Sequence, residues 1–480
     1  MTLLTARDHT LLLELLRLPT AGPLETGPDG EPPRLWAAQR RYADAAAELG
    51  FRVVHHAAAP PDCARRADTP LPVRAAAADP EFLGCQPSLV LALGGDRPRA
   101  ATVMFNVHLD TVAGLEPVSF DGSRFRGRGA IDAKGPAVAL LAGLRAALSA
   151  RPELRADLRI LIQAVSGEEG GALGGFGTRP LVEAGYYGRL NVFCEPTGNL
   201  ALDRCTAAMT ARLRVAGRDA IDDRPQAGHN ASVLLGFLAQ HLAGALDPAP
   251  EQGQVCVAGL RTGPLHNKVY GTGELLVNLS YPSRAAGAEL ERRFTEAVDS
   301  GLREFGDRFR DSHRLALTAA DARAVTRLDW LKRALPALDS AAGPWGRSLL
   351  ARAGVAAWPA TEPGFTCDAI WLADLPDTST FVLGPGTLDG NRAHAAGEFA
   401  DLADLDAFAE LVPRLLAAFH AGRPRGTAPP ELTDLSEPSE PSEPSRRSEP
   451  SARRRVPHAA AQPAAERTPP AGVLRHPDQV

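Results

Sequence analysis

Five residues able to bind a metal ion lie far apart along this chain, each in a short polar phrase next to an apolar segment. These residues are His108 in VHLDT, Asp132 in GRGAIDAKGP, Glu169 in SGEEGG, Glu195 in CEPTG and His394 in AHAAGE. Two imidazoles and three carboxylates form a ligand set suited to zinc, cobalt or manganese ions. If these residues act together, the fold must bring five distant segments to one place, and this requirement constrains the chain more than any other feature.

Apolar strand-like runs alternate with helix-like segments through the first 204 residues. PSLVLALGG, ATVMFNVHL and LRILIQAV are apolar runs bounded by Gly, Pro or charge, whereas KGPAVALLAGLRAALSA has the periodicity of a buried helix. This alternation predicts an α/β fold with a sheet covered by helices on both sides. The candidate ligands come at or just after strand ends, where such sheets place their functional sites.

Residues 205–317 have a different pattern. The strand-like segment TARLRVAG is followed by the helix-like HNASVLLGFLAQHLAGAL, by two further strand-like segments, and then by the long amphipathic AAGAELERRFTEAVDSGLREF. This β-α-β-β-α order predicts a compact inserted domain of the α+β, ferredoxin-like kind.

The α/β pattern resumes after the insert with WLKRALPALDSAAG, STFVLGPG and a final amphipathic helix. The first domain is therefore predicted to be discontinuous, covering residues 1–204 and 318–422. Residues 423–480 form a low-complexity tail rich in Ser, Glu, Pro and Arg. This tail cannot bury apolar area and is predicted to be disordered. Two interpretations of the tail stay open: a docking or phosphorylation segment, and a solvated extension.

Composition narrows the class of protein. The net charge of −5 favours neither a nucleic-acid surface nor a membrane surface. No apolar run reaches transmembrane length. The six cysteines are scattered without a CxxC pair, which is typical of reduced thiols and predicts a cytoplasmic location.

Each phrase taken alone also permits a purely structural interpretation. Strand alternation places His108 and Asp110 on the same side, so Asp110 can accept the second imidazole N–H while His108 binds a metal. The alternative is a core histidine paired with a carboxylate. Asp132, between a glycine-rich turn and a helix start, could bridge two cations or could be a helix N-cap.

The remaining phrases have the same ambiguity. Of the adjacent Glu168 and Glu169, one could bind metal while the other holds a proton, or both could be surface glutamates. Glu195 follows a buried strand and therefore needs a partner for its charge. His394 could equally be an exposed loop histidine.

Taken together and in this order, the phrases resemble the di-zinc metallohydrolases that include acetylornithine deacetylase, succinyl-diaminopimelate desuccinylase, aminoacylases and glutamate carboxypeptidases. The resemblance covers about residues 10–420. It implies a phosphorylase/hydrolase-like mixed sheet with an inserted lid and dimerisation domain. It also implies two divalent metal ions, zinc in the first place, with cobalt or manganese as alternatives.

The resemblance further implies roles for individual residues. Two triplets would each hold one ion: His108, Asp132 and Glu195 for the first, and Asp132, Glu169 and His394 for the second. Asp132 would thus bridge the ions, Glu168 would be the general base, and Asp110 would orient His108. In this family the peptide bond after the bridging aspartate is usually cis, which implies a cis bond between Asp132 and Ala133.

Within the insert, AGHNAS matches the phrase that contains the lid histidine of this family, here His229. In relatives this histidine helps to stabilise the oxyanion, often across a dimer interface, so the resemblance implies a homodimer formed through the lid. Without the resemblance, His229 would be a helix N-terminal histidine. Asn267 matches a substrate-binding asparagine, whereas Ser280 stands where the family usually has an arginine.

The substrate is less well defined. Gly384 and Gly386 match a turn that lines the substrate pocket, and Arg392 is either a ligand for a substrate carboxylate or a surface arginine. Ala133 replaces the methionine or acidic residue of most acetyl- or succinyl-specific relatives, which favours acyl-lysine or acyl-ornithine types. The resemblance implies hydrolysis of the amide bond of an N-acyl amino acid. A dipeptidase or carboxypeptidase, a catalytically silent relative that binds an amino-acid derivative, and a purely structural metal site are the alternatives.

Overall fold

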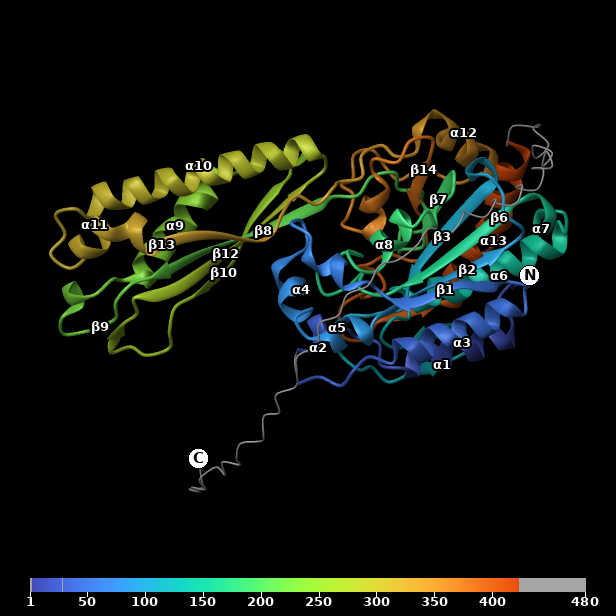
Figure 1. The fold of residues 1–480 in the computed structure, drawn as a ribbon, viewed down its shortest axis with the longest axis horizontal. Helices are drawn as coiled ribbons and strands as arrows, with labels where there is room; N and C mark the ends of the chain where they lie inside the picture. The colour runs from blue at the N-terminus through green and yellow to red at the C-terminus, as the bar shows by residue number, and fades with distance from the viewer. Residues whose placement is uncertain (1, 28, 423–480) are drawn as a thin grey trace, which may run out of the picture. The chain divides into compact units, whose positions relative to one another are not determined.

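The computed structural model describes residues 2–27 and 29–422, so the predicted tail at 423–480 lies outside the described residues. Six strands form the main sheet (Figure 1), in the order β1 (Arg52–Ala58), β2 (Pro87–Leu93), β6 (Arg159–Val165), β3 (Thr102–His108), β7 (Leu190–Phe193) and β14 (Ser379–Val382). Strands β6, β3, β7 and β14 run parallel, and β2 and β1 continue the sheet in antiparallel pairs. The predicted mixed sheet is confirmed, and its four parallel strands have their carboxyl ends at one edge.

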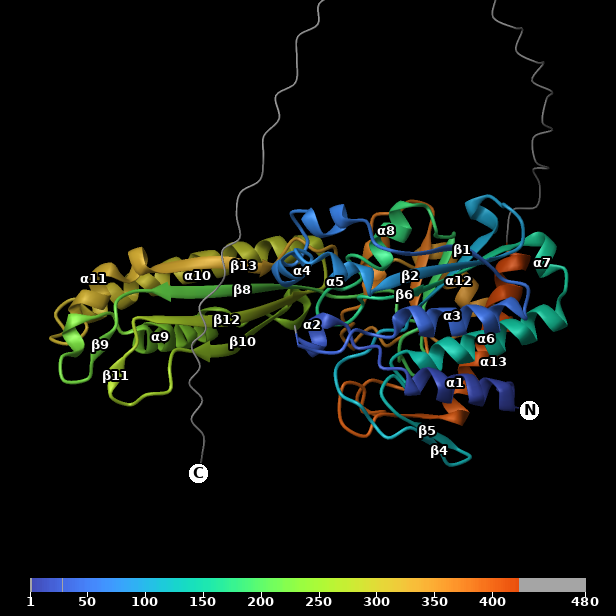
Figure 2. The same cartoon turned by 60° about the horizontal axis from the view of Figure 1, so that its bottom comes forward.

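Both faces of the main sheet are covered, because successive residues of each strand point to opposite sides. In β2, Leu89 and Leu91 belong to one apolar core, and Val90 and Ala92 belong to the other. The helices of the first core are α1 (Ala6–Arg17), α3 (Leu35–Ala47), α6 (Lys134–Ala150), α12 (Gly343–Ala353) and α13 (Leu402–Ala421). The second core includes α8 (Thr178–Glu183) and the 3-10 helix η5 (Asp368–Leu372), on the opposite face in Figure 2. The uniformly apolar strand sequences thus follow from burial on two sides.

Helix α6 is buried around most of its circumference and packs closely against α13. Gly143 permits this approach, since a Cβ at that position would lie 2.6 Å from the carbonyl oxygen of Ala409. The helix begins at Lys134, two residues after the candidate ligand Asp132, so its packing also helps to fix that ligand.

The insert contains a second, antiparallel sheet in the order β10 (Gln254–Arg261), β12 (Thr272–Tyr281), β8 (Ala207–Ala216) and β13 (Thr326–Lys332). Helices α9 (Ala231–Ala245), α10 (Arg284–Phe309) and α11 (Ala316–Val325) complete this domain. Its strand order is that of a ferredoxin-like β-α-β-β-α-β unit. The predicted α+β insert in an α/β fold is therefore present.

The predicted end of the insert at residue 317 is corrected by the structure. Leu317 lies inside α11, and β13 pairs with β8 along Thr326–Lys332. The predicted boundary, which resumes the main domain at residue 318, would place β13 outside the insert. Strand β13 was missed because its segment, TRLDWLK, pairs with a strand more than a hundred residues earlier, and this pairing leaves no local signal.

The remaining elements are short. They are α2 (Pro23–Thr26), η1 (Pro61–Arg65), α4 (Leu71–Ala76), α5 (Pro80–Gly84), η2 (Arg99–Ala101), β4 (Ser119–Phe120), β5 (Arg124–Arg126), α7 (Leu154–Asp157), β9 (Ala220–Ile221), η3 (Pro225–Ala227), η4 (Pro250–Gln252), β11 (Lys268–Val269) and β15 (Phe399–Asp401). Among the helices of the described residues, none has the length and apolar character needed to cross a membrane.

Candidate metal centre

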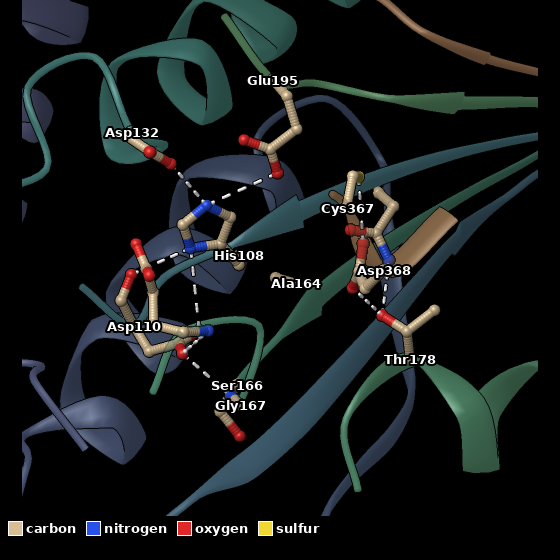
Figure 3. A network of polar contacts seen from close by, with 12 residues as sticks. His108, Asp110, Asp132, Ala164, Ser166, Gly167, Thr178, Glu195, Cys367 and Asp368 are labelled. Atoms are coloured by element: carbon tan, nitrogen blue, oxygen red, sulfur yellow. Dashed lines mark hydrogen bonds and ion pairs between the residues drawn. The ribbon is translucent and has the colours of Figure 1, made fainter. Parts of the chain in front are cut away.

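His108 is the last residue of β3, and its imidazole is fully buried. The Nδ1–H donates to the backbone carbonyl of Asp110 at 2.9 Å, so Nε2 is the nitrogen that faces the carboxylates (Figure 3). Nε2 lies 2.8 Å from Asp132 Oδ1 and 3.5 Å from Glu195 Oε1. Burial lowers the pKa of His108, but Glu195 and Asp132 outweigh it and raise the pKa well above its usual value. The carboxylates of Asp132 and Glu195 thus favour a positive charge at Nε2, which either a proton or a metal ion can supply.

The predicted contact of the Asp110 side chain differs from the structure. Its Oδ1 lies 3.7 Å from His108 Nδ1, beyond hydrogen-bond distance, and the backbone carbonyl of Asp110 accepts the imidazole N–H instead. The side chain turns to the next loop, where Oδ2 accepts the N–H groups of Gly167 and Glu169 at 3.0 and 3.1 Å. Residue 110 therefore orients His108 through its main chain, while its carboxylate accepts two backbone N–H groups of the next loop.

Asp132 lies between two histidines from different parts of the chain. Its Oδ1 contacts His108 Nε2, and its Oδ2 lies 3.0 Å from His394 Nε2. Burial would raise the pKa of Asp132, but the hydrogen bonds from His108 and His394 lower it below the usual value. The Asp132–Ala133 peptide bond is cis, as the resemblance implies. One oxygen faces each histidine, which is the arrangement that a carboxylate bridging two cations requires.

Glu168 and Glu169 follow β6 and differ in their surroundings. Glu169 Oε1 lies 3.1 Å from His394 Nε2, and burial raises the pKa of Glu169 to about 7 although His394 opposes the shift. Glu168 keeps partial exposure to solvent, yet burial and the neighbouring Glu169 raise its pKa well above the usual value. Only Glu169 contacts the second histidine, as expected if it is the ligand and Glu168 the base.

Glu195 and His394 complete the cluster. Glu195 follows β7, and burial raises its pKa to about 7. His394 has a positive φ of 62° and a side chain that is 51% exposed. Its hydrogen bonds with Asp132 and Glu169 raise the pKa of His394 to about 10. The predicted ligands thus span from a fully buried imidazole to one that solvent can reach.

The donor set fits a pair of divalent cations. The ligand atoms within each of three groups lie within 4.8 Å of one another: His108, Asp132 and Glu195; Asp132, Glu169 and His394; and His108, Glu168 and Glu169. The first two groups are the predicted triplets, and the third places Glu168 at the same centre. Burial is the largest cause that raises the pKa values of Glu168, Glu169 and Glu195, so the surrounding protein does not fully compensate their ionised forms. Cations would supply the balance.

The other predicted residues lie outside this cluster of side chains. Gly384 and Gly386 follow β14, and a Cβ on Gly384 would lie 2.4 Å from the carbonyl oxygen of Glu195, so this turn packs against a ligand segment. Arg392 is exposed and has a positive φ of 57°. His229 and Asn267 belong to the insert, where Asn267 is exposed in a turn and His229 is buried against Asp321. The substrate-binding roles of these residues stay predictions.

Two buried carboxylates near the centre were not singled out by sequence reasoning. Glu398 accepts the backbone N–H groups of Ile131 and Asp132 at 3.0 and 3.2 Å and pairs with Arg128. Asp368 is fully buried and lies next to Cys367 and Thr178 in Figure 3. The sequence signals are weak: Glu398 is four residues after His394 but the segment between them forms turns and not a helix, and Asp368 is a lone acid before the apolar segment AIWL.

A helix-covered mixed sheet carries a cluster of histidines and carboxylates at the carboxyl edge of its parallel strands, and this cluster has the donor set of a metal site. The model of peptidase family M20/M25/M40 matches residues 104–418, and the chain belongs to this family. The predicted resemblance to the di-zinc metallohydrolases is confirmed at the level of the family. A comparison with curated protein sequences gives no significant match.

Solved structures share the fold at low sequence identity. The aminopeptidase PepT of Bacillus cereus is 16% identical with a TM-score of 0.61, and the match covers 86% of this chain and 98% of that one. An M20 family metallo-carboxypeptidase of Sulfolobus solfataricus is 11% identical with a TM-score of 0.62, covering 87% and 100%. The YXEP protein of Bacillus subtilis, described as a dinuclear metal-binding peptidase of the M20 family, is 12% identical with a TM-score of 0.56, covering 87% and 98%.

Proposed function

We propose that this protein is a di-metal hydrolase that cleaves the amide bond of an N-acyl amino acid, with Glu168 as general base. The observation that carries the proposal is Asp132, whose two carboxylate oxygens each face a different histidine beside Glu168 and Glu169. A dipeptidase or carboxypeptidase is the second candidate, because the similar solved structures include an aminopeptidase and a carboxypeptidase. Zinc is the proposed metal, with cobalt or manganese as alternatives.

When bound, a pair of divalent cations lowers the pKa of a water molecule and polarises a carbonyl group. The side chains would hold this pair with one shared carboxylate, Asp132, and two further ligands on each side. Glu168 accepts the proton of the attacking water and returns it to the leaving amine. The pKa of Glu168, which burial and Glu169 raise, supports this role because a carboxylate with a raised pKa is a stronger base toward the attacking water.

The substrate class is proposed from two arginines, Arg204 and Arg392. Ser280, which stands where the family usually has an arginine, lines a cavity of about 610 Å³ together with Arg204 and Thr366. Thr366 is two residues from the buried Asp368 in the sequence. The Arg204 guanidinium donates to the carbonyl groups of Pro359 and Glu362, and Arg392 is two residues from His394 in the sequence. Both support a substrate that contains a carboxylate, as N-acyl amino acids and peptides do.

Homodimerisation through the insert, with His229 near the oxyanion, belongs to the same proposal. The imidazole Nδ1 of His229 accepts the Arg218 N–H at 2.8 Å, so the neutral ring carries its proton on Nε2. An Nε2–H is the donor that oxyanion stabilisation needs. A cytoplasmic location is proposed from the cysteines, all six of which are free.

The experiment that tests the proposed function is an assay of amine release. The protein is loaded with zinc or cobalt and offered N-acetyl, N-succinyl and N-acyl lysine or ornithine substrates beside a set of dipeptides. The matched variants are Glu168→Ala, which should retain both ions and lose turnover, and Glu169→Ala, which should lose metal affinity itself. Release from acyl amino acids supports the deacylase, and release from dipeptides alone supports the second candidate. Bound metal without any release contradicts both.

A further inference from the structure

The loop between β6 and α8 contains both Glu168 and Glu169, and it is rich in glycine over residues 167–177. Glycine lowers the barrier to alternative backbone conformations, so a loop of this composition does not hold two side chains in place by itself. External contacts must therefore fix the positions of the base and of its neighbouring ligand.

On one side, Asp110 fixes the start of this loop by accepting the N–H groups of Gly167 and Glu169. The loop then closes on itself, because the N–H of Gly174 donates to the carbonyl of Gly167 at 2.7 Å. Gly174 is thus tied to the residue that precedes Glu168, and any contact that fixes Gly174 also fixes the glutamates.

On the other side, η5 contacts the far end of the loop. The Thr178 hydroxyl donates to Asp368 Oδ2, and the indole N–H of Trp371 donates to the Leu173 carbonyl at 2.6 Å. Gly174 packs directly on Asp368, since a Cβ on Gly174 would lie 2.7 Å from Asp368 Cβ. Asp368 therefore contacts the loop at its closing residue and at the first residue of α8.

A chain of buried hydrogen bonds sets the direction of the Thr178 contact. Asn106 on β3 donates through Nδ2 to Gln163 Oε1 on β6 at 2.9 Å and to Thr178 Oγ1 at 3.1 Å. Because the Thr178 oxygen accepts from Asn106, its own proton is free to be donated to Asp368. The four side chains are 0–1% exposed, so water does not compete for these bonds.

We propose that Asp368 is a positioning residue for the Glu168–Glu169 loop, acting through Thr178 and Gly174 on the side opposite Asp110. The inference rests on the proposed function, because the base and the ligand of that reaction are what Asp368 holds in place. Among the described residues, Asp368 accepts side-chain hydrogen bonds only from the Thr178 hydroxyl and the Cys367 thiol. Burying a carboxylate with such weak donors is unfavourable, and this is why we expect Asp368 to have a role. Removing its partner should let the loop relax away from the metal centre.

The test compares Thr178→Val, Thr178→Ser and Asp368→Asn in the full chain. Thr178→Val removes the hydroxyl at nearly constant shape, whereas Thr178→Ser retains it. The control is Thr380→Val on β14, a fully buried threonine whose hydroxyl has no hydrogen-bond partner. The readouts are the stepwise zinc affinities measured against a chromophoric chelator, the thermal unfolding of the metal-free protein, and kcat and KM on any substrate found.

We expect Thr178→Val and Asp368→Asn to weaken the binding of one of the two ions by about 10- to 100-fold, as loss of a supporting contact does elsewhere. Binding of the other ion should change far less, and kcat should fall more than KM rises. Thr178→Ser should restore the affinity, and Thr380→Val should not alter it. This pattern in variants whose metal-free protein still unfolds cooperatively supports positioning.

Unchanged affinity for both ions in Thr178→Val and Asp368→Asn overturns the proposal, as does failure of Thr178→Ser to restore it. An equal loss for both ions that parallels a loss of fold also overturns it. A wild-type protein that binds two ions but hydrolyses no substrate contradicts only the proposed function, because the affinity measurements still decide the role of Asp368. A wild type that binds no ion contradicts both.

Discussion

The main sheet and the insert each contain a buried histidine with a proposed catalytic role, and the two are held in opposite tautomers. In His108, at the end of β3, Nδ1 donates to a backbone carbonyl, which leaves Nε2 to face carboxylates. In His229 of the insert, Nδ1 accepts a backbone N–H, so the neutral ring has its proton on Nε2 and directs it to Asp321. One backbone group thus decides whether a histidine offers a lone pair, as a metal ligand does, or a donor, as an oxyanion needs.

The two histidines also differ in how far their partners are exposed to solvent. His108 is fully buried among carboxylates that come from separate strand ends. Asp321, the partner of His229, has a side chain that is 45% exposed. A rigid site built on strands suits ligands that must stay in place, whereas a histidine that must release Asp321 to meet a substrate suits a weaker, solvent-exposed partner.

The largest expected effect comes from removing the ligand histidine. His108→Ala should lower metal affinity by more than the roughly 10- to 100-fold that loss of a supporting residue costs, and activity should disappear with the metal. Metal content after dialysis and turnover measured on the same sample provide the check. If His108→Ala retains two ions, His108 is not a ligand, and the proposed difference between His108 and His229 is wrong.

Removing the donor histidine should affect catalysis but not metal binding. His229→Ala should lower kcat by about 10²- to 10³-fold, the range for loss of one oxyanion donor, with both ions retained. Mixing His229→Ala with Glu168→Ala subunits then tests whether His229 acts across a dimer. Each variant alone should have little or no activity, and a mixed dimer that regains activity supports action across subunits. A protein that is monomeric by light scattering would exclude it.

Two helical glycines compare the packing of the two regions. Gly143 in α6 lies against α13, whereas Gly236 in α9 of the insert has no heavy atom within 4 Å of an added Cβ. Gly143→Ala should destabilise the protein by about 1–3 kcal/mol through overpacking. Gly236→Ala should stabilise it by roughly 0.5–1 kcal/mol through helix propensity. Urea unfolding midpoints measure the stability of both variants. Changes of the same sign would show that packing at Gly143 and at Gly236 does not differ as the structure indicates.

A further prediction concerns acid stability. Burial opposes ionisation of Asp8 in α1, but hydrogen bonds from Arg145 and Thr5 lower its pKa below the ordinary 3.8. Because the folded pKa is lowered, the ionised group stabilises the fold above pH 3.8, and this contribution disappears as pH falls through the folded value. Asp8→Asn should cost about 1–3 kcal/mol at pH 7.

Chemical denaturation from pH 7 to pH 3 checks this dependence. The gap between wild type and Asp8→Asn should stay constant down to about pH 5 and then narrow as the carboxyl group protonates. Asp219→Asn, which removes an exposed ion pair with Lys268 in the insert, is the matched comparison and should cost less at every pH. A gap that widens in acid would contradict the role given to Asp8.

Much of the candidate site could be predicted from the sequence, because each ligand phrase is local. An apolar run such as ATVMFNVH specifies a buried strand, and the position of His108 at its end specifies the edge of the sheet where the side chain lies. The order of strands and helices predicted the main α/β fold and the α+β insert. The family phrases then allowed the ligands to be grouped into two triplets before any distance was known.

The partners that polar groups find on distant segments follow only from the packing of the whole chain. The acceptor for His108 is the carbonyl of residue 110, and the Asp110 carboxylate turns to the Glu169 loop instead. Asp368 bonds with Thr178, about 190 residues earlier, and strand β13 pairs with β8, about 110 residues earlier. Local periodicity encodes the kind of element and the face that it buries. The choice among competing hydrogen-bond partners depends on which segments the packed core brings within about 3 Å, and no local pattern records that.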